Sequence, residues 1–151
     1  MHPALSRKLT LEQLKEALQR EGLFGNAVRL QEEAYPLLFV RFTTVTGGER
    51  LLRFDATNYD FQPLEIEPVD PVTRAPLDAG VGMKRGGQPF PPHPLQGGRP
   101  FLCLLGTRSY YTHPSHTPKV TSERWERHRR DMRIVDMLVV IRDRFATGQW
   151  A

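Results

Sequence analysis

Near the start of the chain, three leucines recur at helical spacing and fall on one face: Leu11, Leu14 and Leu18. Thr10 stands where an N-cap residue is expected, and Gln13 three residues later completes a capping box. Gly22 can adopt the left-handed conformation that ends a helix. The pattern therefore predicts a first helix that begins at Thr10 and ends before Gly22.

Alternating apolar and polar residues, rich in β-branched and aromatic side chains, then predict strands. Four runs of this kind occur, over residues 27–31, 37–45, 49–55 and 64–67. Gly47-Gly48 between the second and third runs suits a hairpin turn. Because the connections are short enough to join neighbouring strands, the pattern predicts a four-stranded antiparallel meander after a helix, which is an α+β fold.

The regular pattern stops after Asp70, where proline and glycine become frequent. We expect a loop insertion over residues 70–92, with Met83–Gly87 mobile. A second loop is predicted from Thr107 to Thr121. Between the two loops lies a short apolar run that contains Cys103.

A helix, or two helices joined end to end, is predicted from about Ser122 to Phe145, with Trp125 anchoring its start. Its apolar face consists of residues at helical spacing: Ile134, Leu138, Ile141 and Phe145, with Val135 and Val139 beside them. This face predicts packing on the sheet. Gly148 and its polar neighbours predict a frayed end.

Length and composition suit one soluble domain spanning residues 1–151, with 39% hydrophobic and 25% charged residues. A single cysteine excludes an intramolecular disulfide and favours a reducing compartment. No apolar run approaches the roughly 18 residues that span a bilayer, and the N-terminus lacks a signal-peptide pattern. We therefore expect a cytoplasmic protein that has no membrane partner.

The net charge of +4 is unevenly distributed. Residues 1–75 carry 9 Lys and Arg against 11 Asp and Glu, whereas residues 76–151 carry 12 against 6. The densest basic run contains Arg124, Arg127, Arg129, Arg130 and Arg133. Glu123, Glu126 and Asp131 lie among these arginines, and mixed charge is typical of a solvated helix face. We expect no nucleic-acid partner.

Cys103 follows a segment rich in proline and glycine, and two interpretations of its thiol remain open. It is either a small apolar residue of the core or a nucleophile at the end of a stiff loop. Together with His93, His113 and His116 it also supplies four zinc-capable ligands, but the sequence has no CxxC or HExxH pattern. A cysteine-protease interpretation lacks an activated-nucleophile signature around Cys103.

The order of the elements resembles that of the ubiquitin-conjugating enzymes. Residues 59–64, Tyr-Asp-Phe-Gln-Pro-Leu, are similar to the family's Tyr-Pro-Phe-x-Pro-Pro segment. His93-Pro94 matches the start of the His-Pro-Asn motif, and Cys103 follows His93 by ten positions, as the catalytic cysteine does in the family. Gly98, the run Leu102-Cys103-Leu104 and Trp125 also match family positions. The resemblance covers residues 9–146 and is greatest to divergent bacterial relatives.

The resemblance implies a ubiquitin-conjugating-like fold in which Cys103 carries a ubiquitin-like modifier as a thioester and passes it to an amine or a thiol. It implies that His93 and Pro94 shape the active-site loop, with His93 structural. Leu95 stands where the family has an asparagine that positions the loop and the oxyanion, and an apolar side chain cannot donate that hydrogen bond.

Several side chains are candidates to assist Cys103. We expect His113, or else His116, to replace the missing asparagine by binding the oxyanion or by taking a proton from the attacking amine. Tyr110 or Tyr111 is a possible extra donor. Arg99 and Arg108 flank Cys103 in sequence and would favour its thiolate.

The partners implied by the resemblance are a ubiquitin-like modifier, an adenylating activating enzyme and a protein target, with no cofactor. The activating enzyme is expected to dock on the first helix through Arg7, Lys8, Lys15 and Arg20. Both loops are longer than the family's, and its last two helices are missing. An alternative is therefore a binding module that keeps the fold and has lost transfer activity. A zinc-dependent hydrolase is a weaker alternative.

Overall fold

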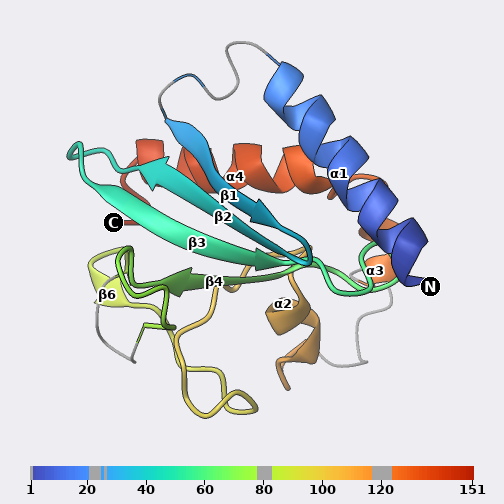
Figure 1. Ribbon diagram of the computed structural model, residues 1–151. Coiled ribbons are helices and arrows are strands. Elements are labelled where there is room, and N and C mark those ends of the chain that lie inside the picture. Colours follow the sequence, from blue (N-terminus) through green and yellow to red (C-terminus); the bar gives the residue numbers. More distant parts are fainter. Residues whose placement is uncertain (1, 21–24, 26, 78–82, 117–123) are drawn as a thin grey trace.

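The helices and strands of the protein form an α+β arrangement, seen in the computed structural model of residues 2–20, 25, 27–77, 83–116 and 124–151 (Figure 1). The helices are α1 (Pro3–Gln19), α2 (Arg108–Thr112), α3 (Trp125–His128) and α4 (Ile134–Ala146). The strands are β1 (Val28–Ala34), β2 (Leu37–Thr43), β3 (Glu49–Asp55), β4 (Glu65–Val69), β5 (Lys84–Arg85) and β6 (Gln88–Pro89).

Strands β1 to β4 form one antiparallel sheet in chain order, which confirms the predicted meander. The turn between β2 and β3 uses Gly47 with a φ of +87°, as the Gly-Gly pair predicted. Strand β3 has the predicted bounds. Strand β1 continues beyond its prediction to Ala34, and β2 ends at Thr43, two residues earlier than predicted.

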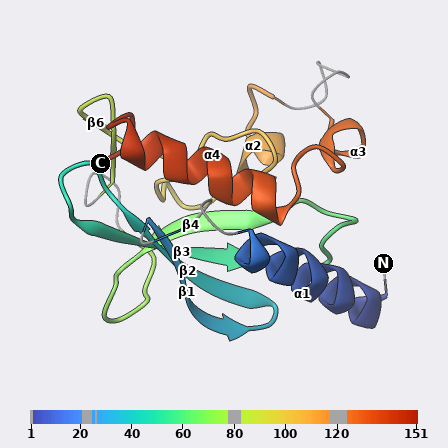
Figure 2. The same ribbon diagram turned by 90° about the horizontal axis from the view of Figure 1, so that it is seen from above.

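The main core lies between this sheet and α4, which runs along one sheet face (Figure 2). Alternation along β2, β3 and β4 buries Phe42, Phe54 and Ile66 in this core. The rings of Phe42 and Phe145 lie 5.7 Å apart between centroids, which joins β2 to the last turn of α4. The predicted packing of a C-terminal helix on the sheet is therefore confirmed.

Helix α1 begins at Pro3 rather than at Thr10, so the predicted N-cap and capping box are wrong. Proline suits the first turn of a helix because its missing N–H has no partner there in any case. Thr10 lies inside the helix, buried, and donates from Oγ1 to the Ser6 carbonyl at 2.8 Å. Leu18 is 53% exposed, because the buried face of α1 consists of Ser6, Thr10, Leu14 and Ala17. The predicted end of this helix, Gly22, lies outside the described residues.

The chain around β5, predicted to be mobile, forms a small hairpin with β6. Residues 149–151 pair with this hairpin, since Lys84 and Ala151 exchange two backbone hydrogen bonds of 2.9 Å. Trp150 is buried against Phe90 and Phe145. The end of the chain is therefore packed, and the predicted fraying is wrong.

Helix α2 interrupts the predicted second loop, and residues 117–121 of that loop lie outside the described part. The predicted C-terminal helix is two separate helices, α3 and α4. Trp125 at the start of α3 is buried and donates from Nε1 to the Asp60 carbonyl at 2.9 Å, so it anchors this segment as predicted.

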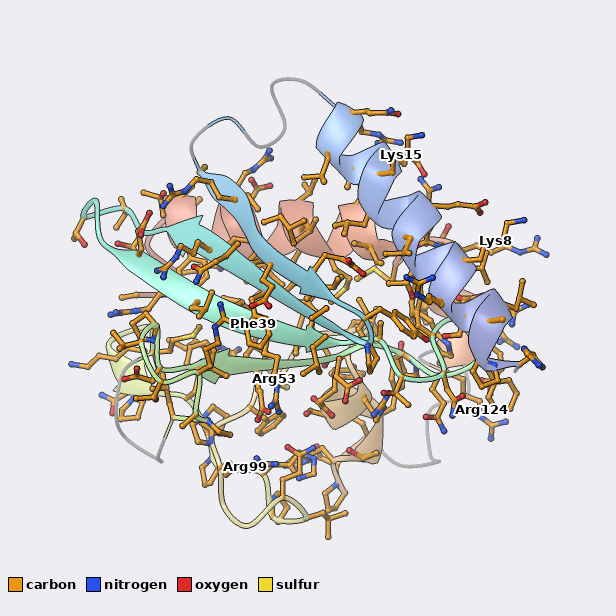
Figure 3. All side chains as sticks on the ribbon, viewed as in Figure 1. Lys8, Lys15, Phe39, Arg53, Arg99 and Arg124 are labelled. Carbon is orange, nitrogen blue, oxygen red and sulfur yellow. The ribbon has the colours of Figure 1, made fainter. Side chains whose placement is uncertain are left out.

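The other face of the sheet carries a small cluster of Phe39, Leu51 and Val69. The Arg74 guanidinium lies 4.5 Å from the centroid of the Phe39 ring and covers it. Figure 3 shows Phe39 and Arg53 on this face, with Arg99 on the loop below β4. Within the described residues, no helix combines the length and apolar character needed to cross a membrane.

Candidate functional site

The segment that carries Cys103 is anchored by apolar side chains on both sides of the thiol. Phe101, Leu102 and Leu104 are buried, whereas Cys103 is partly exposed. The Leu104 amide donates to the Leu102 carbonyl at 2.9 Å, so the backbone makes a three-residue turn with Cys103 at its centre. Cys103 is therefore a partly exposed residue on a tight turn rather than a fully buried core residue.

His116 is the histidine that the structure places beside the thiol. Its Nε2 atom lies 4.0 Å from Sγ of Cys103. The ring of Tyr110 stacks on the His116 imidazole, with centroids 3.9 Å apart and 22° between the planes. A neighbouring imidazolium stabilises a thiolate, and a neutral imidazole can accept a proton from an attacking group. The position of the His116 imidazole beside Sγ suits both roles, stabilising the thiolate and accepting a proton.

His113, which sequence reasoning preferred to His116, has its hydrogen bonds elsewhere. Its ring stacks on Phe101 at 5.3 Å, and its Nδ1 atom lies 2.7 Å from Oγ of Ser115. Desolvation lowers the pKa of His113, and the neighbouring His93 and His116 lower it further. Its centroid is 6.1 Å from that of His116, so it belongs to the same ring cluster without touching the sulfur in any contact we observe.

His93 is completely buried in the loop that leads to Cys103. Its Nδ1 atom accepts a hydrogen bond from the Leu95 amide at 3.1 Å. The proton of the neutral ring is therefore on Nε2, which lies 3.2 Å from the Ser109 carbonyl and donates to it. Pro94 occupies the second position of the turn closed by Gln96 N–H and the His93 carbonyl at 3.2 Å. These contacts hold the loop against α2.

Two carboxylates on β4 attach this loop to the edge of the sheet. Glu65 accepts hydrogen bonds from the Ser109 hydroxyl and, at 3.4 Å, from the Gln96 side chain. Glu67, two residues on and on the same sheet face, forms an ion pair with Arg53 and lies 3.6 Å from the Arg99 guanidinium. The loop before Cys103 is thus attached to β4 at Gln96 and Arg99.

The two arginines predicted to favour the thiolate have other partners. Arg99 pairs with Glu67, and the Arg108 guanidinium donates to the carbonyls of Thr57 at 2.9 Å and Pro63 at 3.3 Å. Both guanidinium groups are thus held near the sheet. Their closeness to Cys103 in sequence did not indicate which groups they contact.

Other predicted site residues are dispersed around this centre. Tyr111 packs against Tyr110 and Trp125 and supports the start of α3. Leu95 is 69% exposed, so its side chain points into solvent. Within the part of the chain that the structure describes, no three or more His, Cys, Asp or Glu side chains form a group that could hold a metal ion.

The four cations expected on the first helix are exposed, and three of them lie on α1, whereas Arg20 is the residue that follows its last turn. Lys8 lies 3.9 Å from Glu12, and Arg20 lies 2.8 Å from Glu16. Figure 3 shows Lys8 and Lys15 directed outward from the helix. Arg7 and Lys15 have no ion pair within the described residues, so α1 presents free positive charge to solvent.

Sequence reasoning missed Thr107, which is completely buried and caps α2 by accepting a hydrogen bond from the Tyr110 amide. The signal was present, because threonine is a common N-cap residue. It also missed Tyr110 as the stacking partner of His116. Stacking between rings in different turns of the chain follows no sequence pattern that could have predicted it.

Comparison with known proteins adds one relative. The chain is similar to the uncharacterized protein y4jH of Sinorhizobium fredii, with 27% identity over 156 aligned positions that cover 81% of this chain and 74% of that protein. No family model matches the chain.

Proposed function

We propose that this protein is a bacterial ubiquitin-conjugating-like acyltransferase that carries a ubiquitin-like modifier as a thioester on Cys103. The observation that carries the proposal is a partly exposed Cys103 whose Sγ lies 4.0 Å from Nε2 of His116. This thiol lies ten positions after the buried, loop-shaping His93. The order of helix, antiparallel meander, cysteine loop and C-terminal helix supports the same proposal.

The chemistry begins with exchange between two thioesters. The Cys103 thiolate attacks the modifier's C-terminal carbonyl, a C–S bond forms, and the thiolate of the activating enzyme leaves. In the second step an amine or thiol of the target attacks the new thioester, and Cys103 leaves as thiolate. His116 receives the proton from the attacking amine, because its Nε2 atom lies beside the reacting sulfur.

The partners follow from this reaction. An adenylating activating enzyme supplies the modifier, and the exposed cations on α1 and at its C-terminal end offer it an electropositive docking surface: Arg7, Lys8, Lys15 and Arg20. We place the reaction in the cytoplasm, where a free thiol remains reduced.

The second candidate is a binding module that keeps this fold and transfers nothing. The observation in its favour is Leu95, which stands where a side-chain donor would be expected and is 69% exposed to solvent. Such a module would bind the modifier through its surface and would not require a reactive thiol.

The experiment combines the purified protein with ATP, a bacterial ubiquitin-like protein and the adenylating enzyme that activates it. The wild type is expected to form an adduct that a reductant cleaves. Cys103→Ser is expected to form an ester that survives the reductant, and Cys103→Ala is expected to form no adduct. Binding of the modifier by wild type with no thiol-sensitive adduct would select the binding module.

A further inference from the structure

One hydroxyl group holds both carbonyl groups that flank Cys103. Oγ1 of Thr107 lies 2.7 Å from the Leu104 carbonyl oxygen and 3.3 Å from the Leu102 carbonyl oxygen. Thr107 is completely buried, so both carbonyls are directed toward the interior. The hydroxyl shares its one hydrogen between two acceptors.

The direction of these carbonyls determines where the next two amides point. Cis peptide bonds occur at residues 35–36 and 59–60, so the units that join Leu102 to Cys103 and Leu104 to Leu105 are trans. In a planar trans unit the N–H points opposite to the C=O. The amides of Cys103 and Leu105 therefore point away from the Thr107 hydroxyl. Both residues are partly exposed. Neither amide donates a hydrogen bond to any residue that the structure describes.

We propose that the amides of Cys103 and Leu105 form an oxyanion hole, and that Thr107 is the positioning residue that aims them. The proposal takes from the proposed function only that Cys103 is an acyl-accepting nucleophile. When its thiolate attacks a carbonyl, a C–S bond forms and the π electron pair moves to oxygen. The two N–H groups donate to that oxyanion, which then collapses and expels the leaving group. The nucleophile's own amide serves this purpose in serine proteases.

This arrangement accounts for the apolar side chain at position 95. A side-chain donor is unnecessary where two backbone donors lie on the nucleophile's own turn. Leu95 is free to point into solvent, as observed. The oxyanion hole is therefore part of the backbone of residues 102–107.

The turn after Cys103 permits a direct test of the Leu105 amide. The Thr107 amide donates to the Leu104 carbonyl at 3.1 Å, and Gly106 has a φ of +97°, which together define a type II turn with Leu105 at its second position. Proline is common at that position, so Leu105→Pro removes one N–H and keeps the turn. Leu105→Ala keeps the N–H and removes the side chain, which makes it the matched control.

The experiment compares two reactions of Cys103 in the purified protein. Acylation by p-nitrophenyl acetate passes through an oxyanion, whereas alkylation by iodoacetamide occurs at saturated carbon and does not. We expect Leu105→Pro to slow acylation by roughly tenfold or more while alkylation stays within about twofold. Leu105→Ala is expected to resemble wild type in both reactions. Equal effects of Leu105→Pro on both reactions, or none on acylation, would overturn the proposal.

Thr107 is tested by the same ratio of acylation to alkylation. Thr107→Val removes the hydroxyl and is expected to lower the ratio, and Thr107→Ser keeps the hydroxyl and should restore it. Thr10→Val controls for the loss of a buried threonine hydroxyl, because Thr10 is equally buried and bonded to a carbonyl, on α1. If Leu105→Pro fails to fold, the Thr107→Val and Thr107→Ser pair decides the question, and an unchanged ratio in Thr107→Val contradicts the proposal.

The ester probe requires neither modifier nor activating enzyme. A protein that passes the ester test and never accepts a modifier has the oxyanion hole without the proposed carrier function. A protein that accepts a modifier with an unchanged acylation ratio in the variants has the carrier function without this oxyanion hole.

Discussion

The imidazole of His116 stacks on the ring of Tyr110, with centroids 3.9 Å apart. Tyr110 lies in α2, whose first turn is capped by Thr107, and Thr107 also holds the turn around Cys103. The thiol and the imidazole are therefore positioned from the same short helix. This shared support lets two groups 13 residues apart in sequence meet at 4.0 Å.

His116→Gln tests the contribution of the imidazole to the reactivity of Cys103. We expect alkylation by iodoacetamide near neutral pH to slow by roughly tenfold or more, because Nε2 of His116 lies 4.0 Å from Sγ and can accept the proton of the thiol as it reacts. Rates are read by mass spectrometry over time. His2→Gln, at the exposed N-cap of α1, is the control and should react like wild type. An unchanged rate in His116→Gln would remove His116 from the site.

His93→Leu is expected to destabilise the protein by about 1–3 kcal/mol, because it leaves the Leu95 amide without its partner and removes one of the donors to the Ser109 carbonyl. Urea denaturation followed by circular dichroism gives the free energy of unfolding. His113→Leu should cost less, since the observed hydrogen bonds of the His113 side chain are local, to Ser115. A cost for His93→Leu no larger than that for His113→Leu would argue against the structural role of His93.

Trp150→Ala is expected to lower the free energy of unfolding by roughly 3–5 kcal/mol, the range typical of removing a large buried aromatic side chain. Trp150 is 1% exposed and its ring lies 5.2 Å from that of Phe90 and 5.6 Å from that of Phe145, between centroids. Thermal or urea unfolding measures the change, and Trp150→Phe should lose much less. A loss below about 1 kcal/mol for Trp150→Ala would show that the end of the chain is not packed in solution.

The stability of the protein should fall as the pH decreases through the titration of His113. Desolvation, with the nearby His93 and His116, lowers the pKa of this imidazole from its ordinary 6.5. The unfolded chain then binds a proton at a higher pH than the folded protein, so protonation favours unfolding below about pH 6.5. Urea denaturation from about pH 7.5 to pH 5.5 measures the slope. His113→Gln should flatten it, and an unchanged slope would contradict the assignment.

Parts of the fold were predictable because their causes are local. Glycines at positions 47 and 48 favour a tight turn, and alternation in the flanking residues sets which side chains face the core, so the hairpin of β2 and β3 was found almost to the residue. The start of α1 was missed for an equally local reason. Thr10 looked like a cap, but it is a buried helical residue that bonds to the Ser6 carbonyl, while Pro3 begins the helix.

The sequence by itself determined the four-stranded meander, the amphipathic final helix and the position of Cys103 after a turn-rich loop, because periodicity and turn residues act over a few positions. Only the tertiary structure decided which histidine faces the sulfur, where Arg99 and Arg108 point and how Trp150 is packed. Those outcomes depend on contacts between distant segments, such as Glu67 on β4 with Arg99, and such contacts leave no periodic pattern in the chain.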